Sequence, residues 1–173
     1  MLNSDASALP SVRRIITGHN EAGVAVVRSE DTVAAESSVP GLSGHQLWLT
    51  NETPTNDNNS DVDGMTRTAD GDYGLVTRDG TNLRFTDLAP GARVPMHRTS
   101  SLDYNVLLAG QIILEMEDGS ETLIENIGDT VIQKGTIHAW RNPGPGWARW
   151  LSVLIDAKPA VVGGKALAPD YRA

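Results

Sequence analysis

The chain has 173 residues, of which 39% are apolar and 21% are charged, and its formal net charge is −8 at pH 7. This length and composition predict one globular domain with a single core. The acidic balance disfavours nucleic acid, whose binding requires Lys and Arg to neutralise phosphates, and no basic run or long apolar stretch favours a membrane. Because the chain contains no Cys, disulfides, thiolate metal sites and cysteine nucleophiles are excluded.

The first 40 residues are predicted to form an N-terminal strand arm. Residues 12–17 and 24–29 are rich in Val and Ile and flank a polar turn that contains Gly18 and Gly23, a pattern typical of two strands joined by a turn. Residues 1–5 show neither the basic nor the apolar region of an export signal. We therefore expect a soluble, cytoplasmic protein.

Residues 41–158 are predicted to form the main domain, which a long acidic loop interrupts. A strand is expected over residues 44–50, and residues 51–73 then contain six acids and one base. Such a polar segment buries little apolar surface, so we expect a surface loop. An inert insertion is favoured over a lid.

Short segments bounded by Gly, Pro, Asp or Asn follow this loop. Strands are expected at residues 83–88, 94–99, 104–108, 111–117, 121–124, 129–133, 138–141 and 148–156. Over residues 148–156 apolar side chains occupy both faces of a period-two pattern, which predicts a strand buried on both sides. The whole pattern predicts an all-β sandwich or barrel. Residues 159–173 form a C-terminal tail to which no role is assigned.

Two spaced motifs lie within this barrel region. In the first, five residues separate Gly91 from His97, Thr99 follows two positions later, and Asp103 precedes Gly110 by seven positions. The second begins at Gly128, contains Lys134 and Gly135, and continues to His138 and Asn142.

These motifs, in this order, resemble the paired motifs of the cupin superfamily over residues 91–142. The first cupin motif has a second His where Thr99 stands and a Glu where Asp103 stands, and the second has a Pro near Lys134. The stretches around His97 and His138 are similar to a subgroup of single-domain cupins of mostly unassigned function. The resemblance implies a double-stranded β-helix, the cupin or jelly-roll barrel, and a homodimer formed through N-terminal strands.

The spacing also has a direct physical meaning. Residues two apart on a strand share a face, so His97 shares one with Thr99, and Asp103 shares one with Asn105. A neighbouring strand offers His138. Two imidazoles and one carboxylate that converge suit a divalent ion such as Zn, Fe, Mn or Ni, with Thr99 as a weak ligand that leaves positions open for water and substrate.

The rival hypothesis is a site without metal in which His97, Asp103 and His138 act as acid and base. An imidazole has an unperturbed pKa near 6.5 and works in either role near neutral pH, and a buried carboxyl can act as a base or orient an imidazole. Purely structural histidines are the third alternative.

Four further residues are candidates for contact with substrate beside Thr99. Asn105 shares the face of Asp103, Trp140 shares that of His138 and could wall the cavity, and Arg98 could bind an anionic group. Tyr104 is a weaker candidate, because it points away from Asp103 on a regular strand.

Three functions remain open at this stage. The first is a lyase- or isomerase-type enzyme of secondary metabolism that performs dehydration, decarboxylation, isomerisation or cyclisation on a small organic or polyketide-like metabolite. The second is an Fe(II)-dependent dioxygenase, for which two His and one carboxylate form the expected ligand set. The third is a module that binds a small ligand without catalysis.

Overall fold

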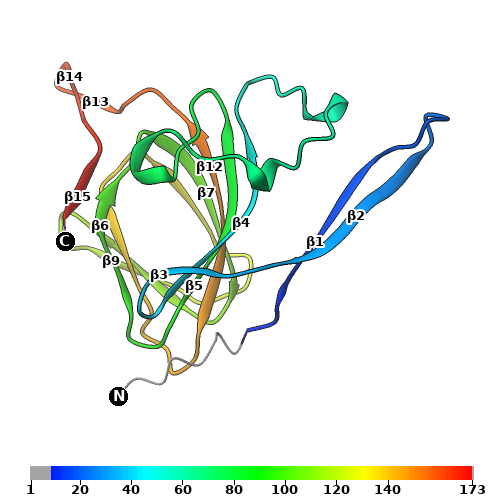
Figure 1. Ribbon diagram of the computed structural model, residues 1–173. Coiled ribbons are helices and arrows are strands. Elements are labelled where there is room, and N and C mark those ends of the chain that lie inside the picture. Colours follow the sequence, from blue (N-terminus) through cyan, green and yellow to red (C-terminus); the bar gives the residue numbers. More distant parts are fainter. Residues whose placement is uncertain (1–8, 173) are drawn as a thin grey trace.

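Alternating apolar residues build two antiparallel β-sheets that face each other, as the computed structural model shows for residues 9–172 (Figure 1). The first sheet has the order β10-β7-β12-β5-β4-β3. Its strands are β3 (Glu36–Val39), β4 (Leu42–Thr50), β5 (Thr81–Leu88), β7 (Ser101–Ala109), β10 (Thr130–Lys134) and β12 (Ala148–Asp156). The predicted all-β jelly-roll barrel is confirmed.

The second sheet has the order β15-β6-β11-β8-β9. Its strands are β6 (Arg93–Arg98), β8 (Ile112–Met116), β9 (Glu121–Ile124), β11 (His138–Arg141) and β15 (Asp170–Arg172). Consecutive strands cross from one sheet to the other at β5–β6, β6–β7, β7–β8, β9–β10, β10–β11 and β11–β12. Residues of both motifs therefore face one interior.

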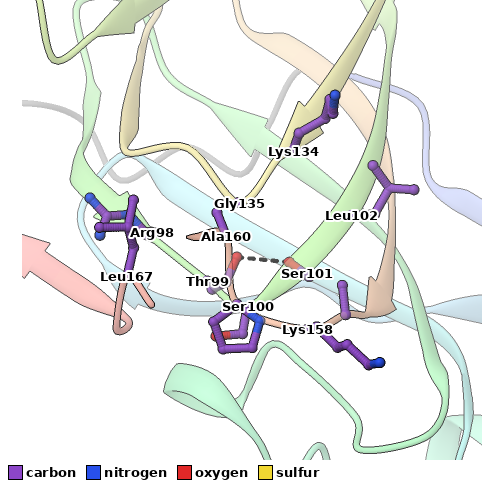
Figure 2. A pocket seen from close by; sticks show the side chains of 12 residues that line it. Arg98, Thr99, Ser100, Ser101, Leu102, Lys134, Gly135, Lys158, Ala160 and Leu167 are labelled. Atoms are coloured by element: carbon purple, nitrogen blue, oxygen red, sulfur yellow. Dashed lines mark hydrogen bonds between the residues drawn. The ribbon is translucent and has the colours of Figure 1, made fainter. Parts of the chain in front are cut away.

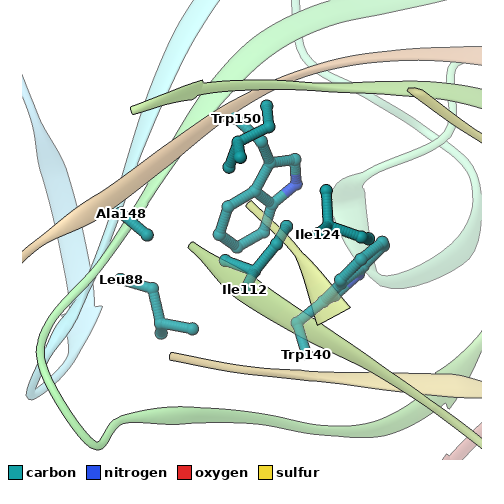
Figure 3. Packing of buried hydrophobic residues seen from close by; sticks show 7 residues of the cluster. Leu88, Ile112, Ile124, Trp140, Ala148 and Trp150 are labelled. Atoms are coloured by element: carbon teal, nitrogen blue, oxygen red, sulfur yellow. The ribbon is translucent and has the colours of Figure 1, made fainter. Parts of the chain in front are cut away.

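The apolar core fills one part of the space between the sheets. Figure 3 shows Trp140 from β11 and Trp150 from β12 pointing toward each other, and their ring centroids are 5.7 Å apart. Both belong to a buried cluster with Leu88, Leu107, Ile112, Ile124 and Ala148. Side chains that share a face with these residues therefore point into the barrel.

The N-terminal arm is a hairpin of β1 (Val12–His19) and β2 (Ala25–Val33) that projects from the barrel (Figure 1). At its base, Val12 and Val33 pack with Leu47 against the outer face of the first sheet. The first eight residues of the predicted arm lie outside the described residues. The homodimer expected through this arm stays a prediction.

The 51–73 segment is largely exposed, but ion pairs anchor it. It contains the short turns η1 (Asp57–Asn59), η2 (Gly64–Thr66) and η3 (Asp72–Gly74). The Asp63 carboxylate accepts two hydrogen bonds from Arg14 of the arm, each of 2.7 Å. Arg67 pairs with Asp57 at 2.7 Å. The segment therefore links the arm to the barrel. That it is an inert insertion and not a lid stays a prediction.

The C-terminal tail continues the β-structure instead of lying loosely across the barrel. The hairpin of β13 (Val161–Val162) and β14 (Lys165–Ala166) leads to β15, which pairs with β6 and places Tyr171 opposite His97. The tail thus supplies an edge strand beside the first motif. Among the described residues, none of the helical turns is long and apolar enough to cross a membrane.

A buried ion pair joins β5 to β12 on the outer face of the first sheet. Asp87 is 0% exposed and accepts hydrogen bonds of 2.5 and 2.6 Å from the guanidinium of Arg149. Nε2 of His45 lies 3.2 Å from Oδ2 of Asp87, an oxygen that also accepts from Arg149. Arg149 further donates to the Pro10 carbonyl at 2.7 Å. The cluster ties the start of the arm to the barrel.

We predict that Asp87→Asn lowers the free energy of unfolding by about 3–5 kcal/mol, because it leaves the Arg149 guanidinium buried without its counter-charge. Chemical denaturation followed by far-UV circular dichroism measures this loss. The control is Glu30→Gln, which breaks the exposed pair of Arg13 with Glu30 and should leave stability essentially unchanged. Equal losses in the two variants would contradict the prediction.

Candidate active site

His97 and His138 stand directly opposite each other on paired strands β6 and β11. Antiparallel partners point to the same side of a sheet, and His138 shares its side with Trp140 of the core. Both imidazoles therefore face the interior, and their ring centroids lie 4.4 Å apart. The two motifs, 41 positions apart at these histidines, meet as the sequence predicts.

Backbone carbonyls fix the tautomer of each histidine. Nδ1 of His97 lies 2.8 Å from the Pro95 oxygen, and Nδ1 of His138 lies 3.0 Å from the Thr136 oxygen. Because a carbonyl only accepts, Nδ1 carries the proton in both neutral rings. Each Nε2 thus presents a lone pair, and neither has a hydrogen-bond partner among residues 9–172.

Burial keeps both imidazoles neutral. It lowers the pKa of His97 below 6.5, although the bond to Pro95 opposes this change. For His138, burial and then the neighbouring His97 lower the pKa to about 4. Two neutral nitrogen bases consequently sit side by side at physiological pH.

Asp103 lies on the facing sheet, on β7, and shares its face with Asn105 and the core residue Leu107. Burial raises the pKa of its carboxyl to about 6, and a hydrogen bond from Ser101 opposes the increase. One carboxylate oxygen, Oδ1, is buried with no hydrogen-bond partner in the described structure. Asp103 is therefore an acid that exchanges its proton near neutral pH.

Gln133 lies beside Asp103 in the sheet and shares a backbone acceptor with His138. Gln133 on β10 stands opposite Asp103 and is buried. Its Nε2 donates to the Thr136 oxygen at 3.3 Å, the same oxygen that accepts from Nδ1 of His138. The sequence does not predict that Gln133 belongs to the site, because only the register of β10 against β7 places it beside Asp103.

Two of the three predicted metal ligands lie side by side in the structure. His97 and His138 offer two suitable nitrogens, but no group of three or more His, Cys, Asp or Glu within residues 9–172 is placed to hold one ion. Asp103 stands on the facing sheet. Metal binding by His97, Asp103 and His138 together stays a prediction.

Asn105 and Trp140 line the interior as expected. Asn105 is buried on β7, and its side-chain oxygen accepts a hydrogen bond of 2.6 Å from Ser152. The Trp140 ring meets His138 edge-on, at 5.5 Å between centroids, and also packs in the core. It thus forms the apolar floor beneath the histidines.

Three other candidates lie elsewhere. Strand β6 ends at Arg98, so Thr99 sits in the turn to β7, where its hydroxyl meets Ser101 at 2.8 Å. Arg98 and Thr99 line a separate pocket of about 190 Å³ formed with Lys134 and Lys158 (Figure 2). Tyr104 is 40% exposed and points away from Asp103. Alternation along β7 turns Tyr104 outward. Thr99 is instead buried, and Ser101, which its hydroxyl contacts, also hydrogen-bonds Asp103.

Comparison with known proteins gives the family. The chain is 32% identical to phomopsin biosynthesis cluster protein D of Diaporthe leptostromiformis, over 95% of this chain and 89% of that protein. It is 34% identical to the cupin-domain-containing oxidoreductase fogC of Aspergillus ruber, over 95% and 86% of the two chains. The chain belongs to the cupin superfamily.

Other comparisons of this cupin are weaker. No protein-family model matches the chain. The polyketide cyclase RemF from Streptomyces resistomycificus aligns with a TM-score of 0.49 and 16% identity, over 80% of this chain and 79% of that chain.

We predict that Asp103→Asn stabilises this cupin at pH 8 by about 2–3 kcal/mol. The pKa of Asp103 is about 6 in the folded protein and near 4 in the unfolded chain. Above pH 6 the folded state therefore bears the cost of a buried carboxylate, and below pH 4 both states bind the proton. The stability gain should disappear as the pH falls from 6 to 4, as measured by urea denaturation across this range.

Asp129→Asn is the matched control. Asp129 is an exposed carboxylate that accepts hydrogen bonds from the backbone N–H groups of Asn126 and Glu125, which lower its pKa. Its replacement should destabilise the protein at neutral pH, the opposite sign to Asp103→Asn. The same sign in both variants would refute the assignment of Asp103.

Proposed function

We propose that this cupin is an enzyme of secondary metabolism that moves protons on a small organic metabolite inside the barrel. The observation that carries the proposal is the pair of buried, neutral imidazoles whose Nδ1–H groups are held by backbone carbonyls. Each leaves Nε2 free as a base in a low-dielectric interior. Reaction types that fit are dehydration, isomerisation, decarboxylation and cyclisation.

A dehydration illustrates how the residues would work. Nε2 of His138 or His97 accepts the proton of a substrate C–H, and the released electron pair forms a C=C bond. The neighbouring C–O bond breaks, and its oxygen leaves as water after taking the carboxyl proton of Asp103. A proton then returns from the imidazolium to the Asp103 carboxylate, which balances the cycle.

The unusual order of the two pKa values supports this division of roles. The pKa of His138 is about 4 and that of Asp103 about 6, so between these values the imidazole is neutral while the carboxyl keeps its proton. Environments that separate the pKa values of neighbouring groups are a recurrent basis for assigning acid and base. For a reaction that needs both groups, we expect greatest activity in mildly acidic solution.

The context of the relatives supports a biosynthetic role. Phomopsin biosynthesis cluster protein D takes its name from a biosynthetic cluster, and it aligns over nearly its whole length with this chain. We infer from this that the substrate is an intermediate of a comparable assembly pathway.

A redox reaction is the second candidate, because fogC is named an oxidoreductase and two imidazole nitrogens are open. Oxygen uptake that appears only on addition of Fe(II) and disappears in His97→Ala would favour it. Ligand binding without turnover in any assay would favour the binding module.

We predict that the wild-type protein accelerates the elimination of 5-nitrobenzisoxazole, a probe whose single reactive C–H needs only a base. His97→Ala and His138→Ala should each lower the rate about tenfold or more, within the range of general-base catalysis. Because the pKa of His138 is about 4, the rate should rise with pH around that value and stay level above pH 6. Release of the nitrophenolate product is followed by absorbance.

His19→Ala is the control, since His19 is exposed on the arm, and its rate should equal that of the wild type. Circular dichroism confirms that the variants are folded. Full activity in folded His97→Ala and His138→Ala, or a rate that follows an ordinary imidazole near pH 6.5, would overturn the proposal.

A further inference from the structure

Arg84 points into the barrel from the middle of β5. Trp150 and Ala148 of the core pair with Thr86 and Leu88, and Ser152 pairs with Arg84. Antiparallel partners share a face, so Arg84 lies on the inner face with Ser152. Ser152 in turn pairs with Asn105 of β7. Asn105, Ser152 and Arg84 thus form one row across the sheet.

This row lies at the level of the two histidines. Strand β11 leads through a turn into β12, which returns on the facing sheet, and Trp140 touches Trp150 between them. Two residues back from Trp140 is His138, and two residues forward from Trp150 is Ser152. The strands run in opposite directions, so these steps go the same way along the barrel. His138 therefore faces the row that contains Arg84.

The Arg84 guanidinium has no partner in the protein. Arg14, Arg67, Arg141 and Arg149 each pair with a carboxylate, whereas Arg84 forms no ion pair or side-chain hydrogen bond with any residue of the described range 9–172. Burial lowers its pKa, and the charge of the exposed Glu36 only partly offsets this effect. A desolvated cation without a partner lowers the stability of the folded protein. Local violations of this kind are expected at functional sites, which suits a residue that binds a ligand.

Gly44 makes room for this guanidinium. A Cβ atom on Gly44 would lie 2.5 Å from Nη2 of Arg84, so the guanidinium rests on the bare backbone of β4. Gly44 and Arg84 thus form one feature, and even an alanine at position 44 would displace the charge. Nothing in the two motifs pointed to either residue.

We propose that Arg84 binds a carboxylate of the substrate, so that the protein acts on a small organic acid. The planar fork of a guanidinium matches the two oxygens of a carboxylate, and a buried site strengthens that bond. The bound acid would lie in the layer between Arg84 and the two imidazoles. This inference rests on the proposed function for the reaction, but the binding step can be measured without turnover.

Benzoate and its neutral counterpart benzamide are the probes, with binding measured by calorimetry. Wild-type protein should bind benzoate about tenfold or more tightly than benzamide, because only benzoate offers the guanidinium a charged carboxylate. Arg84→Met should remove this preference, and Gly44→Ala should weaken benzoate binding although the charge remains. Arg78→Met removes an exposed arginine and should change nothing.

Thermal unfolding shows whether a variant that loses benzoate binding is still folded. Because Arg84 is unpaired, Arg84→Met should unfold at the wild-type temperature or above it. No benzoate preference in the wild type, or the same preference in Arg84→Met, overturns the inference. A failed elimination assay with normal benzoate binding would reject the proposed function and keep Arg84 as an acid-binding residue.

Discussion

The pairing of β6 with β11 sets His97 opposite His138 and turns both rings toward the closed space between the sheets. Each ring has one nitrogen held by a carbonyl of its own strand segment, two positions before the histidine. The same local bond thus occurs in both motifs. Without it the rings could present either nitrogen, and the interior would have no fixed base.

Charge is handled differently on the two faces of the first sheet. On the outer face, Asp87 is fully buried but satisfied by Arg149, with His45 alongside, and Arg14 holds Asp31 and Asp63. On the inner face, Asp103 keeps one oxygen unpaired and Arg84 has no partner in the described structure. The outer groups attach the arm and the acidic loop, whereas the inner groups are left available.

These unpaired groups explain why the interior costs stability. A buried carboxyl whose pKa rises to about 6 and a desolvated guanidinium both oppose folding, and a better-packed apolar interior would avoid them. Both groups face the same interior as the two neutral imidazoles. The apolar floor of Trp140 and Trp150 closes one end of it.

The sequence alone determined the all-β barrel, because period-two patterns and turn residues are local properties of the chain. Strands 121–124, 138–141 and 148–156 have the predicted limits. The sequence did not predict β3 or β13–β15, because these segments are short and polar or rich in Gly and Pro. Motif spacing also predicted that His97 and His138 lie together. Strand alternation predicted that Tyr104 and Asp103 point to opposite faces of the sheet.

Only the tertiary structure decided which groups share the chamber. It placed Asp103 on the facing sheet, turned Arg98 and Thr99 to another pocket, and brought in Gln133 and Arg84. The physical reason is that alternation assigns residues to two faces of one strand, whereas the partner strand and its register depend on contacts between distant segments. Gln133 lies beside Asp103 and Arg84 beside Ser152 through such pairings, which no local pattern encodes.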